Sequence, residues 1–379
     1  MPSTADLPLH TGHVPQWMLR IMEKLAGAII EYMVEVRGPS SVIAMLSDPL
    51  WFQAFNNVIG MDWDSSGSTT VVGGVLKTIT WRKPHLGLLV LGGKGARMRE
   101  VPREAEKAAE LFDLDPGRLK AASKLAARVD SSLLQDGYDL YIHLMAVSED
   151  GEYVVVQQGM NTSIGMARRY HVARYEVEEP HSGVAGTPSG AILNVTDRDS
   201  REARKLFLDI IGEGPRRVLR LLEEANRVAR GSPTILDYIE AGSPMVKRPA
   251  RPYYKPVIPS RNLIRSIERL ASSQPSSEVE LALAPGLGPK VVRALALIAD
   301  IIYGVPTSTR DPTTHPLDPF LYAYAIGGKD GVPYKFDAKT AMEAYRFLEE
   351  ALEQASIGEK AKARALERLR MLARRTLDI

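Results

Sequence analysis

The segment 285–290, which reads PGLGPK, has the residue types of a phosphate-binding turn. Apolar residues at helical spacing lie on both sides of it, so the pattern predicts two helices joined by a tight turn. Gly286 and Gly288 would let the backbone approach a phosphate, and the second helix would present its unpaired N-terminal amides to the same group. Leu287, between the two glycines, would point inward and hold the turn in place.

This segment resembles the helix-hairpin-helix motif, whose pattern is apolar-x-x-Pro-Gly-apolar-Gly-x-Lys, and we place the motif at 276–304. Lys290 and Arg293 would add positive charge beside the bound anion. The resemblance implies contacts with the phosphate backbone of nucleic acid, most simply DNA, that are structure-selective or non-specific. Affinity should then fall steeply with salt. The competing interpretation is a glycine-rich helix connection that binds no ligand.

A fainter copy of the same pattern lies earlier in the chain, in FLDIIGEGPRRVLRLL. Gly212 and Gly214 would correspond to Gly286 and Gly288. Glu213 departs from the pattern, because it puts a charge where an apolar residue is expected. An ordinary helix junction is therefore the favoured interpretation here.

Acidic residues in the first half of the chain could bind a divalent metal ion. Asp62 and Asp64 lie in MDWDSSG, and Asp136 and Asp139 begin a predicted strand that also carries His143. Mg²⁺ or Mn²⁺ bound by these four aspartates could activate water to attack a phosphodiester. Strand alternation predicts that Asp139 and His143 share one face. The competing interpretation is that the aspartates cap turns and that His143 is a hydrogen-bonded core residue.

A glycine-rich stretch follows a predicted buried strand. Gly92, Gly93, Lys94 and Arg97 could form a phosphate nest, in which Lys94 would also stabilise negative charge during catalysis. A strand-end turn with a solvated basic loop explains the same residues equally well. A similar Gly-Gly-Lys occurs at 327–329.

The segment MARRYH adds a third group of basic residues beside the predicted strands. It contains Arg168, Arg169 and His171. A solvated charged face is the default expectation for such a cluster.

The elements that must position these residues divide the chain into two parts. The first part alternates helical patterns with short strands and contains a β-hairpin around Glu149-Asp150-Gly151, which predicts an α/β (α+β) domain at 1–196. A helical segment is expected at 197–241, and a proline-rich basic linker at 242–260. The rest, 261–379, is predicted to be a mostly helical nucleic-acid-binding region that contains the turn. The expected helices are 15–36, 102–111 and 116–134, and the first expected strand is 86–91.

The composition excludes several classes of site. The chain of 379 residues has no cysteine, which rules out disulfides, thiolate catalysis and cysteine-bound zinc. Lysine and arginine number 48 against 46 acidic residues, so a nucleic-acid surface would need clustered charge. The first residues lack a signal-peptide pattern, and no long apolar window occurs, so we expect a cytoplasmic protein with no membrane contact. Few Asn and Gln residues beside abundant Arg, Glu and Pro favour a heat-adapted source.

Several segments together resemble an archaeal and bacterial family catalogued as domain of unknown function 763. They are LPLHTGHVPQWM, SDPLWFQAFNNVIGMDWDSSGSTT, LGGKGAR, LLQDGYDLYIHLMAV, VVVQQGMN, ARRYH and AYAIGGKDGVPY. The resemblance extends over nearly the full length. It places the hairpin region inside the family pattern and implies no catalytic residue.

These observations lead to the hypothesis of a DNA-processing protein, a Mg²⁺- or Mn²⁺-dependent nuclease acting in repair, with the DNA backbone as partner. One alternative is a non-catalytic scaffold, with repair or replication proteins as partners. A DNA glycosylase is a second, although no catalytic aspartate follows the turn at the distance that glycosylases with this motif use. An RNA-processing role is a third. The sequence leaves open whether the protein forms a homodimer.

Overall fold

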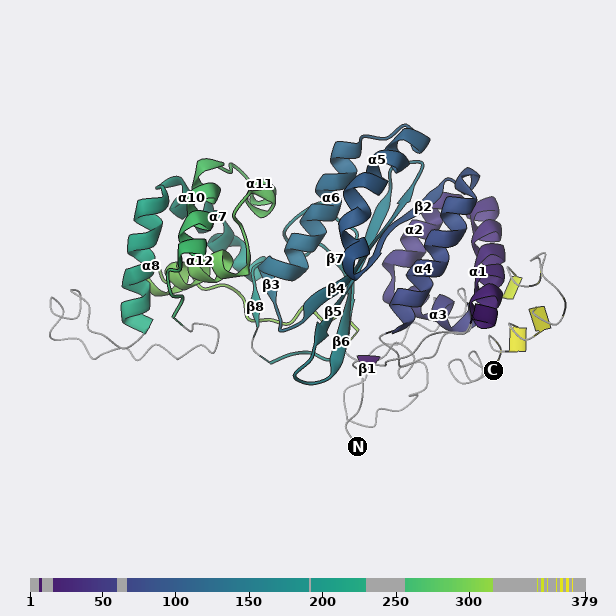
Figure 1. Ribbon diagram of the computed structural model, residues 1–379. Helices are drawn as coiled ribbons and strands as arrows, with labels where there is room; N and C mark the ends of the chain where they lie inside the picture. The colour runs from purple at the N-terminus through teal and green to yellow at the C-terminus, as the bar shows by residue number, and fades with distance from the viewer. Residues whose placement is uncertain are drawn as a thin grey trace.

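The computed structural model describes residues 7–8, 16–59, 67–190, 192–229 and 256–315, and scattered helical positions between 346 and 370. Figure 1 shows a sheet covered by helices on both faces and, beside these layers, a separate helical bundle. Helices α1–α4 lie on one side of a central antiparallel sheet, α5 and α6 lie on its other face, and a bundle made of α7, α8 and α10–α12 lies beyond them. The described part is thus a mixed α/β structure with a helical region toward the C-terminus.

The central sheet has six strands in the order β1-β6-β5-β4-β2, with β7 paired to β6. All its pairings are antiparallel. The predicted hairpin is confirmed as β4 and β5, and its turn contains Gly151 at φ 81°. The strands are β1 (Leu7–Pro8), β2 (Leu88–Lys94), β4 (Asp139–Ser148), β5 (Tyr153–Asn161), β6 (Met166–Val172) and β7 (His181–Ala185). A separate two-stranded sheet pairs β3 (Leu134–Gln135) with β8 (Leu193–Asn194).

The prediction that Asp139 and His143 share one face of the sheet is wrong. The register of β4 against β5 shifts between Leu140 and Ile142. Asp139 pairs with Met160, whereas His143 pairs with Gln157. Because such an irregularity adds a residue and breaks the two-residue alternation, the two side chains lie on opposite faces.

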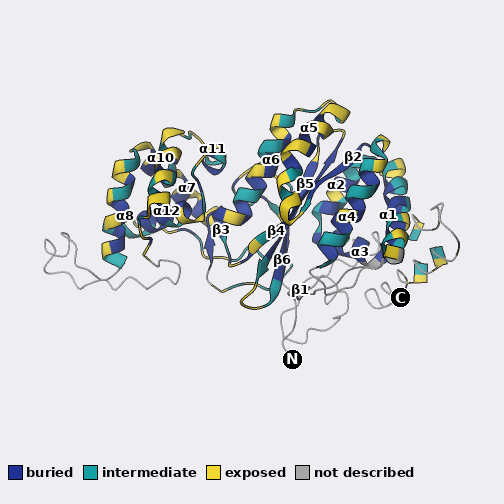
Figure 2. Ribbon diagram, viewed as in Figure 1, coloured by how far each residue is buried: buried dark blue, intermediate teal, exposed yellow. Residues whose placement is uncertain are grey.

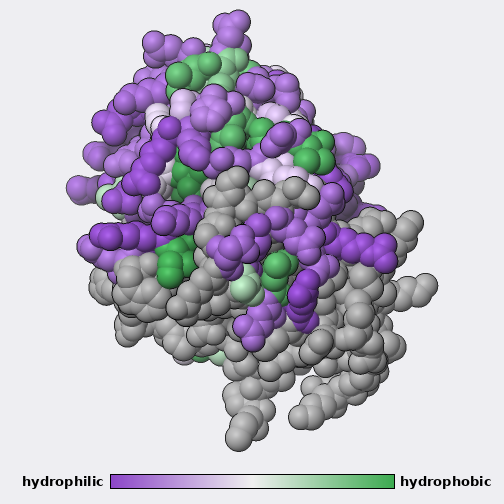
Figure 3. Space-filling view, turned by 90° about the vertical axis from the view of Figure 1, so that its right-hand side faces the viewer, coloured by the Kyte–Doolittle hydropathy of each residue, from purple (hydrophilic) through white to green (hydrophobic). Residues whose placement is uncertain are grey.

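One face of the sheet is covered by helices from the first part of the chain. Buried apolar side chains of these helices pack on Leu88, Val90, Ile142, Leu144 and Val156. Gly73 lies so close to the sheet that a Cβ there would be 2.2 Å from Leu144 Cδ1, which fixes the distance of α4 from β4. The helices are α1 (Gln16–Arg37), α2 (Pro39–Ser47), α3 (Pro49–Ile59) and α4 (Gly67–Arg82). Figure 3 shows that the described surface on this side is mainly hydrophilic, with separate apolar groups.

The opposite face is covered by α5 (Val101–Phe112) and α6 (Pro116–Arg128), which pack small side chains against the strands. Ala105, Ala108 and Ala122 are buried there beside Met145 and Val155. Figure 2 shows the buried residues concentrated in the sheet and on the helix faces turned toward it. Alanines allow the helices to approach closely, so this layer is thin and tightly packed.

The helical bundle contains α7 (Arg201–Gly212), α8 (Pro215–Ala229), α10 (Arg261–Ser272), α11 (Glu278–Leu283) and α12 (Pro289–Ile301). These helices share one apolar core, to which Leu125 of α6 and Val129 and Leu133 of the following turn also contribute. Helices from the segments 197–241 and 261–379 therefore pack together. Residues 230–255, which include most of the expected linker, lie outside the described residues.

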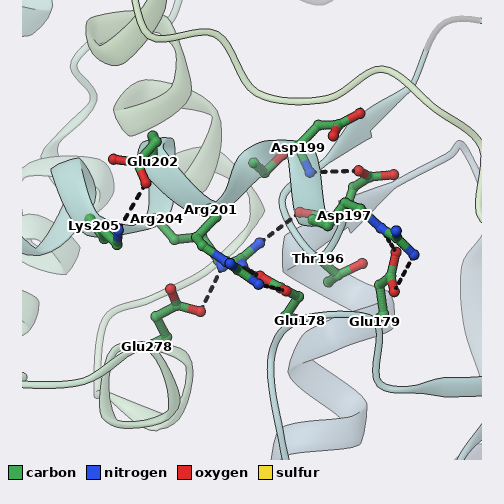
Figure 4. Close-up of polar contacts among 12 residues, drawn as sticks. Glu178, Glu179, Thr196, Asp197, Asp199, Arg201, Glu202, Arg204, Lys205 and Glu278 are labelled. Atoms are coloured by element: carbon green, nitrogen blue, oxygen red, sulfur yellow. Dashed lines mark hydrogen bonds and ion pairs between the residues drawn. The ribbon is translucent and has the colours of Figure 1, made fainter.

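Arg204 of α7 joins the bundle to the sheet region. Its side chain is buried, and it donates to Glu278 Oε2 at the start of α11 (2.6 Å) and to the carbonyls of Val195 and Asp197 (both 2.8 Å). It also forms an ion pair with Glu178, as Figure 4 shows. Because Glu278 lies in the first turn of α11, this contact fixes one end of the helical hairpin.

No helix in the described part of the chain has the length and apolar character needed to span a membrane.

Candidate functional site

The connection between α11 and α12 lies at the position that the residue pattern predicts. α11 ends at Leu283 and α12 begins at Pro289, with Pro at the first helical position. Leu287 is 2% exposed and belongs to the bundle core, as expected for the residue that holds the turn in place. The structure therefore contains two helices and a tight connection at the predicted position.

The two glycines of the turn have different roles. Gly286 has φ 96°, and a Cβ there would be 2.2 Å from Ser266 O of α10, so this glycine is needed for packing. Gly288 is the N-cap of α12, and a Cβ at that position would have no neighbour within 4 Å. Only Gly288 therefore has open space on its side-chain side.

The N-terminus of α12 has no side-chain cap. The Val292 amide donates to Gly288 O (3.0 Å), so the first intrahelical bond begins there. The amides of Lys290 and Val291 precede this bond and have no carbonyl one turn back inside the helix. With the positive end of the helix dipole, these groups can bind an anion.

Basic side chains surround this helix end. Lys290 is exposed, and Arg293 donates its Nε–H to Gln135 Oε1 (3.1 Å). Gln135 in turn donates to Pro289 O (2.9 Å), and Lys124 of α6 donates to Leu283 O (2.6 Å). The side chains of α6 and β3 therefore support both ends of the turn.

An open pocket beside the turn is lined by side chains of α10 and by Pro285 of the turn. Its charged residues are Arg265, Arg269 and Glu268. Both arginines are exposed. These two arginines are not among the residues predicted from the sequence motifs, although Arg261, Arg265 and Arg269 recur every fourth residue, the spacing that places side chains on one helix face. No comparable pattern in the sequence marks Gln135 or Lys124 as neighbours of the turn.

The fainter copy of the pattern is a different connection. Gly212 lies in α7, and Gly214 alone has a positive φ, 87°. Only Glu213 and Gly214 separate α7 from α8, and Glu213 pairs with Arg217 (3.0 Å). The segment is a short helix junction, as the favoured interpretation expects.

The structure does not bring the predicted metal ligands together in its described part. Asp62 and Asp64 lie outside the described residues. Asp136 is buried and paired with Arg168 (2.8 Å), whereas Asp139 is exposed. Within the described ranges, no group of three or more His, Asp or Glu residues is placed to hold a metal ion.

His143 lies inside a chain of buried hydrogen bonds on the α6 face of the sheet. Its Nδ1 bonds Gln157 Oε1 and its Nε2 bonds Ser123 Oγ, both at 2.8 Å. Gln157 donates to Asp130 Oδ2 (2.5 Å), whose other oxygen bonds His181 Nε2 (2.6 Å). Both imidazole nitrogens of His143 are therefore used within the protein.

The predicted phosphate nest is occupied in part by the protein's own carboxylate. β2 continues through Lys94 instead of ending at Leu91. The Gly92 amide donates to Glu104 Oε2 (2.7 Å), and Glu104 is paired with Lys77 (2.6 Å). Gly93 precedes Lys94 and Arg97, which are both exposed.

The basic residues of MARRYH are not a solvated face. Arg168, Arg169 and His171 are each at most 1% exposed. Arg168 lies on the face of the sheet opposite to Arg169 and His171, because neighbouring strand residues alternate. The default expectation of a charged surface here is wrong, since ion pairs and hydrogen bonds hold these side chains inside the protein.

Buried neutral histidines make stability depend on pH. Burial lowers the pKa of His143 and lowers that of His171 well below the ordinary 6.5. Below pH 6.5 each imidazole is protonated more readily in the unfolded chain than in the folded protein. The free energy of unfolding should therefore fall with decreasing pH below 6.5, by up to about 1.4 kcal/mol per pH unit for each histidine.

Urea unfolding at several pH values between about 7 and about 5 checks this dependence. His143→Gln should reduce the slope, and the matched change of the exposed His85 should leave it as it is. An unchanged slope in a folded His143→Gln protein would contradict the assignment.

Comparison with known proteins places this chain in a family. The model of the family described as "Protein of unknown function (DUF763)" matches residues 3–336. No curated protein and no solved structure matches the chain significantly. Because the family match spans most of the sequence, the chain belongs to this family of proteins of unknown function.

Proposed function

We propose that this protein binds nucleic acid, most simply duplex DNA, through backbone phosphates at the α11–α12 turn. The observation that carries the proposal is the uncapped N-terminus of α12, with Gly288 facing open space and the exposed Lys290 beside it. Backbone amides and a lysine recognise phosphate oxygens without regard to base sequence. Binding should therefore be non-specific in sequence or selective for DNA structure.

The arginines of α10 extend this basic surface. Arg265 and Arg269 line the pocket that Pro285 borders, so they can contact further phosphates near the one bound at α12. Glu268 in the same pocket is a like charge to DNA and limits the attraction. The net charge of +2 is small, so this local cluster must supply most of the electrostatic attraction.

Metal-dependent cleavage by Asp62, Asp64, Asp136 and Asp139 stays a prediction. The contact between Asp136 and Arg168 favours a structural role for that aspartate. Binding without cleavage is the simpler proposal, because it needs only groups whose geometry is described. A scaffold, a glycosylase and an RNA-binding protein remain the alternatives.

Replacing Lys290 by glutamate tests the proposal. Lys290→Glu should weaken binding of a short duplex by at least about tenfold, because a charge-assisted contact with phosphate contributes about 1.5–3 kcal/mol. Fluorescence anisotropy with a labelled duplex at low salt measures the change. Lys107→Glu on α5 makes the same change of charge at another exposed position and should have little effect.

Equal affinities of the wild type and Lys290→Glu would reject the turn as the contact. If Lys290→Glu and Lys107→Glu lose the same amount of duplex affinity, net charge alone drives binding. Competition with duplex RNA separates the two nucleic acids, because A-form RNA places its phosphates differently.

A further inference from the structure

The α/β part of the chain contacts the α11–α12 turn at both of its ends. Lys124 of α6 donates to Leu283 O at the end of α11 (2.6 Å), and Gln135 of β3 donates to Pro289 O at the start of α12 (2.9 Å). Figure 1 shows the end of α6 and β3 next to the helical bundle. The bonded residues are 159 and 154 positions apart in the sequence, so both contacts form only when the bundle packs beside the sheet.

The side-chain amide of Gln135 is fixed on both sides. Its nitrogen donates to two carbonyl oxygens, Ser132 O (3.0 Å) and Pro289 O (2.9 Å), which uses both of its N–H groups. Its oxygen faces the other way and accepts from Arg293 Nε (3.1 Å). Because carbonyls can only accept and the arginine can only donate, an exchanged orientation of the amide would lose all three bonds.

Arg293 is held at Nε and open at the end of its guanidinium. The side chain is half-buried, and the bond to Gln135 is its one hydrogen bond or ion pair within the part of the chain that the structure describes. The N–H groups of its two terminal nitrogens remain for an external acceptor. Two parallel N–H groups of this kind match the oxygens of a phosphate.

The same amide keeps Arg293 beside the first turn of α12. Arg293 lies one helical turn after Pro289, so both are on one helix face, and side chains of a helix lean toward its N-terminus. Gln135 bonds both residues, and Pro289 is the first residue of the helix. The guanidinium therefore lies near the helix end that presents the unpaired amides of Lys290 and Val291.

We propose that Gln135 is a positioning residue for nucleic-acid binding, which sets Arg293 to bind a backbone phosphate next to the one at the start of α12. The inference rests on the proposed function of the α11–α12 turn. Gln135 carries no charge and does not itself touch the phosphate. It orders a long side chain in advance, so less conformational entropy is lost on binding. The binding site thus includes the α/β part of the chain.

Replacing Arg293 by methionine tests the phosphate contact. Arg293→Met should weaken binding of a short duplex by at least about tenfold and lower the slope of log affinity against log salt concentration by about 1. Fluorescence anisotropy at several salt concentrations measures both. Arg20→Met, the same change at an exposed position of α1, should leave both close to the wild-type values. An unchanged affinity and slope for Arg293→Met would overturn the inference.

Replacing Gln135 by methionine removes the amide and keeps the length of the side chain. Gln135→Met should weaken duplex binding by about three- to tenfold, because Arg293 must then be ordered on binding. In the Arg293→Met background the same change should alter affinity by less than about twofold, since Gln135 acts through Arg293. A residue that merely holds the shape of the turn would weaken binding in both backgrounds. Gln135→Ala gives the same comparison if the methionine variant does not fold.

The outcomes separate this inference from the proposed function. If Lys290→Glu weakens binding and Gln135→Met does not, the turn binds nucleic acid and the role of Gln135 is wrong. Equal losses from Gln135→Met with and without Arg293 would make its role purely structural and overturn the inference. If neither Lys290→Glu nor Arg293→Met changes the affinity, the proposed function fails, and the role of Gln135 fails with it.

Discussion

Replacing Arg168 by methionine is expected to lower the free energy of unfolding by about 3–5 kcal/mol, because the change removes one partner of a buried ion pair. The Arg168 guanidinium, with no exposed side-chain surface, donates to Asp136 Oδ2 (2.8 Å) and pairs with Asp311 (3.1 Å). It also lies 4.6 Å over the Tyr138 ring. Asp136 accepts a second hydrogen bond from the Tyr170 hydroxyl (2.7 Å). The arginine thereby joins β6 to two segments distant in sequence.

Arg168→Met would leave the Asp136 carboxylate buried without a cation. Adding Asp136→Asn to this variant should restore part of the lost free energy of unfolding. The amide oxygen of the asparagine can still accept from the Tyr170 hydroxyl, and the amide carries no charge. Urea unfolding of the two single variants and the double variant measures this coupling. If Arg168→Met lowers the free energy of unfolding by less than about 1 kcal/mol, the Arg168–Asp136 ion pair contributes no more than an exposed pair does, and the prediction is wrong.

Local sequence patterns predict the α11–α12 turn well. Proline at the first helical position and a glycine before it are signals confined to a few residues. Leu287 could be assigned to the core because it is the one apolar residue within the turn. The packing role of Gly286, which leaves no room for a side chain, could not be predicted from local residues. It depends on the carbonyl of Ser266, which only the packing of α10 brings near.

The side chains of the sheet were harder to predict, because strand pairing decides their surroundings. A register shift after Leu140 places Asp139 and His143 on opposite faces, and no local residue announces it. Arg168 and Arg169 read as a charged surface, yet each faces a different buried network. Their partners Asp136 and Gln53 lie far away in the sequence, so only the tertiary fold reveals the pairing.

Two buried acceptor atoms without hydrogen-bond partners, on α3 and β6, had no sequence signal. His171 belongs to a basic segment of the sequence, and Asn56 lies in an apolar helix pattern. Their importance comes from the atoms that stay without hydrogen bonds after folding, Nε2 of His171 and Oδ1 of Asn56. A missing contact of this kind cannot be read from residue types.

The central claim, that the amides at the start of α12 hold a phosphate of nucleic acid, is tested most directly by Gly288→Asp. Gly288 has an extended backbone (φ −160°) with open space around it, so the new side chain can cap the helix. Its carboxylate would accept from the Lys290 and Val291 amides and repel phosphate. Stability should stay the same or rise by a few tenths of a kcal/mol.

Duplex affinity should fall by more than about tenfold in the same variant, because two donors are occupied and a like charge is added. Gly190→Asp, which adds the same charge at another open and exposed glycine, is the matched control and should bind as the wild type does. Fluorescence anisotropy at low salt, with unfolding measured on the same samples, gives both quantities. A more stable Gly288→Asp protein with much weaker binding is the result we predict, and a folded variant with wild-type affinity would contradict the claim.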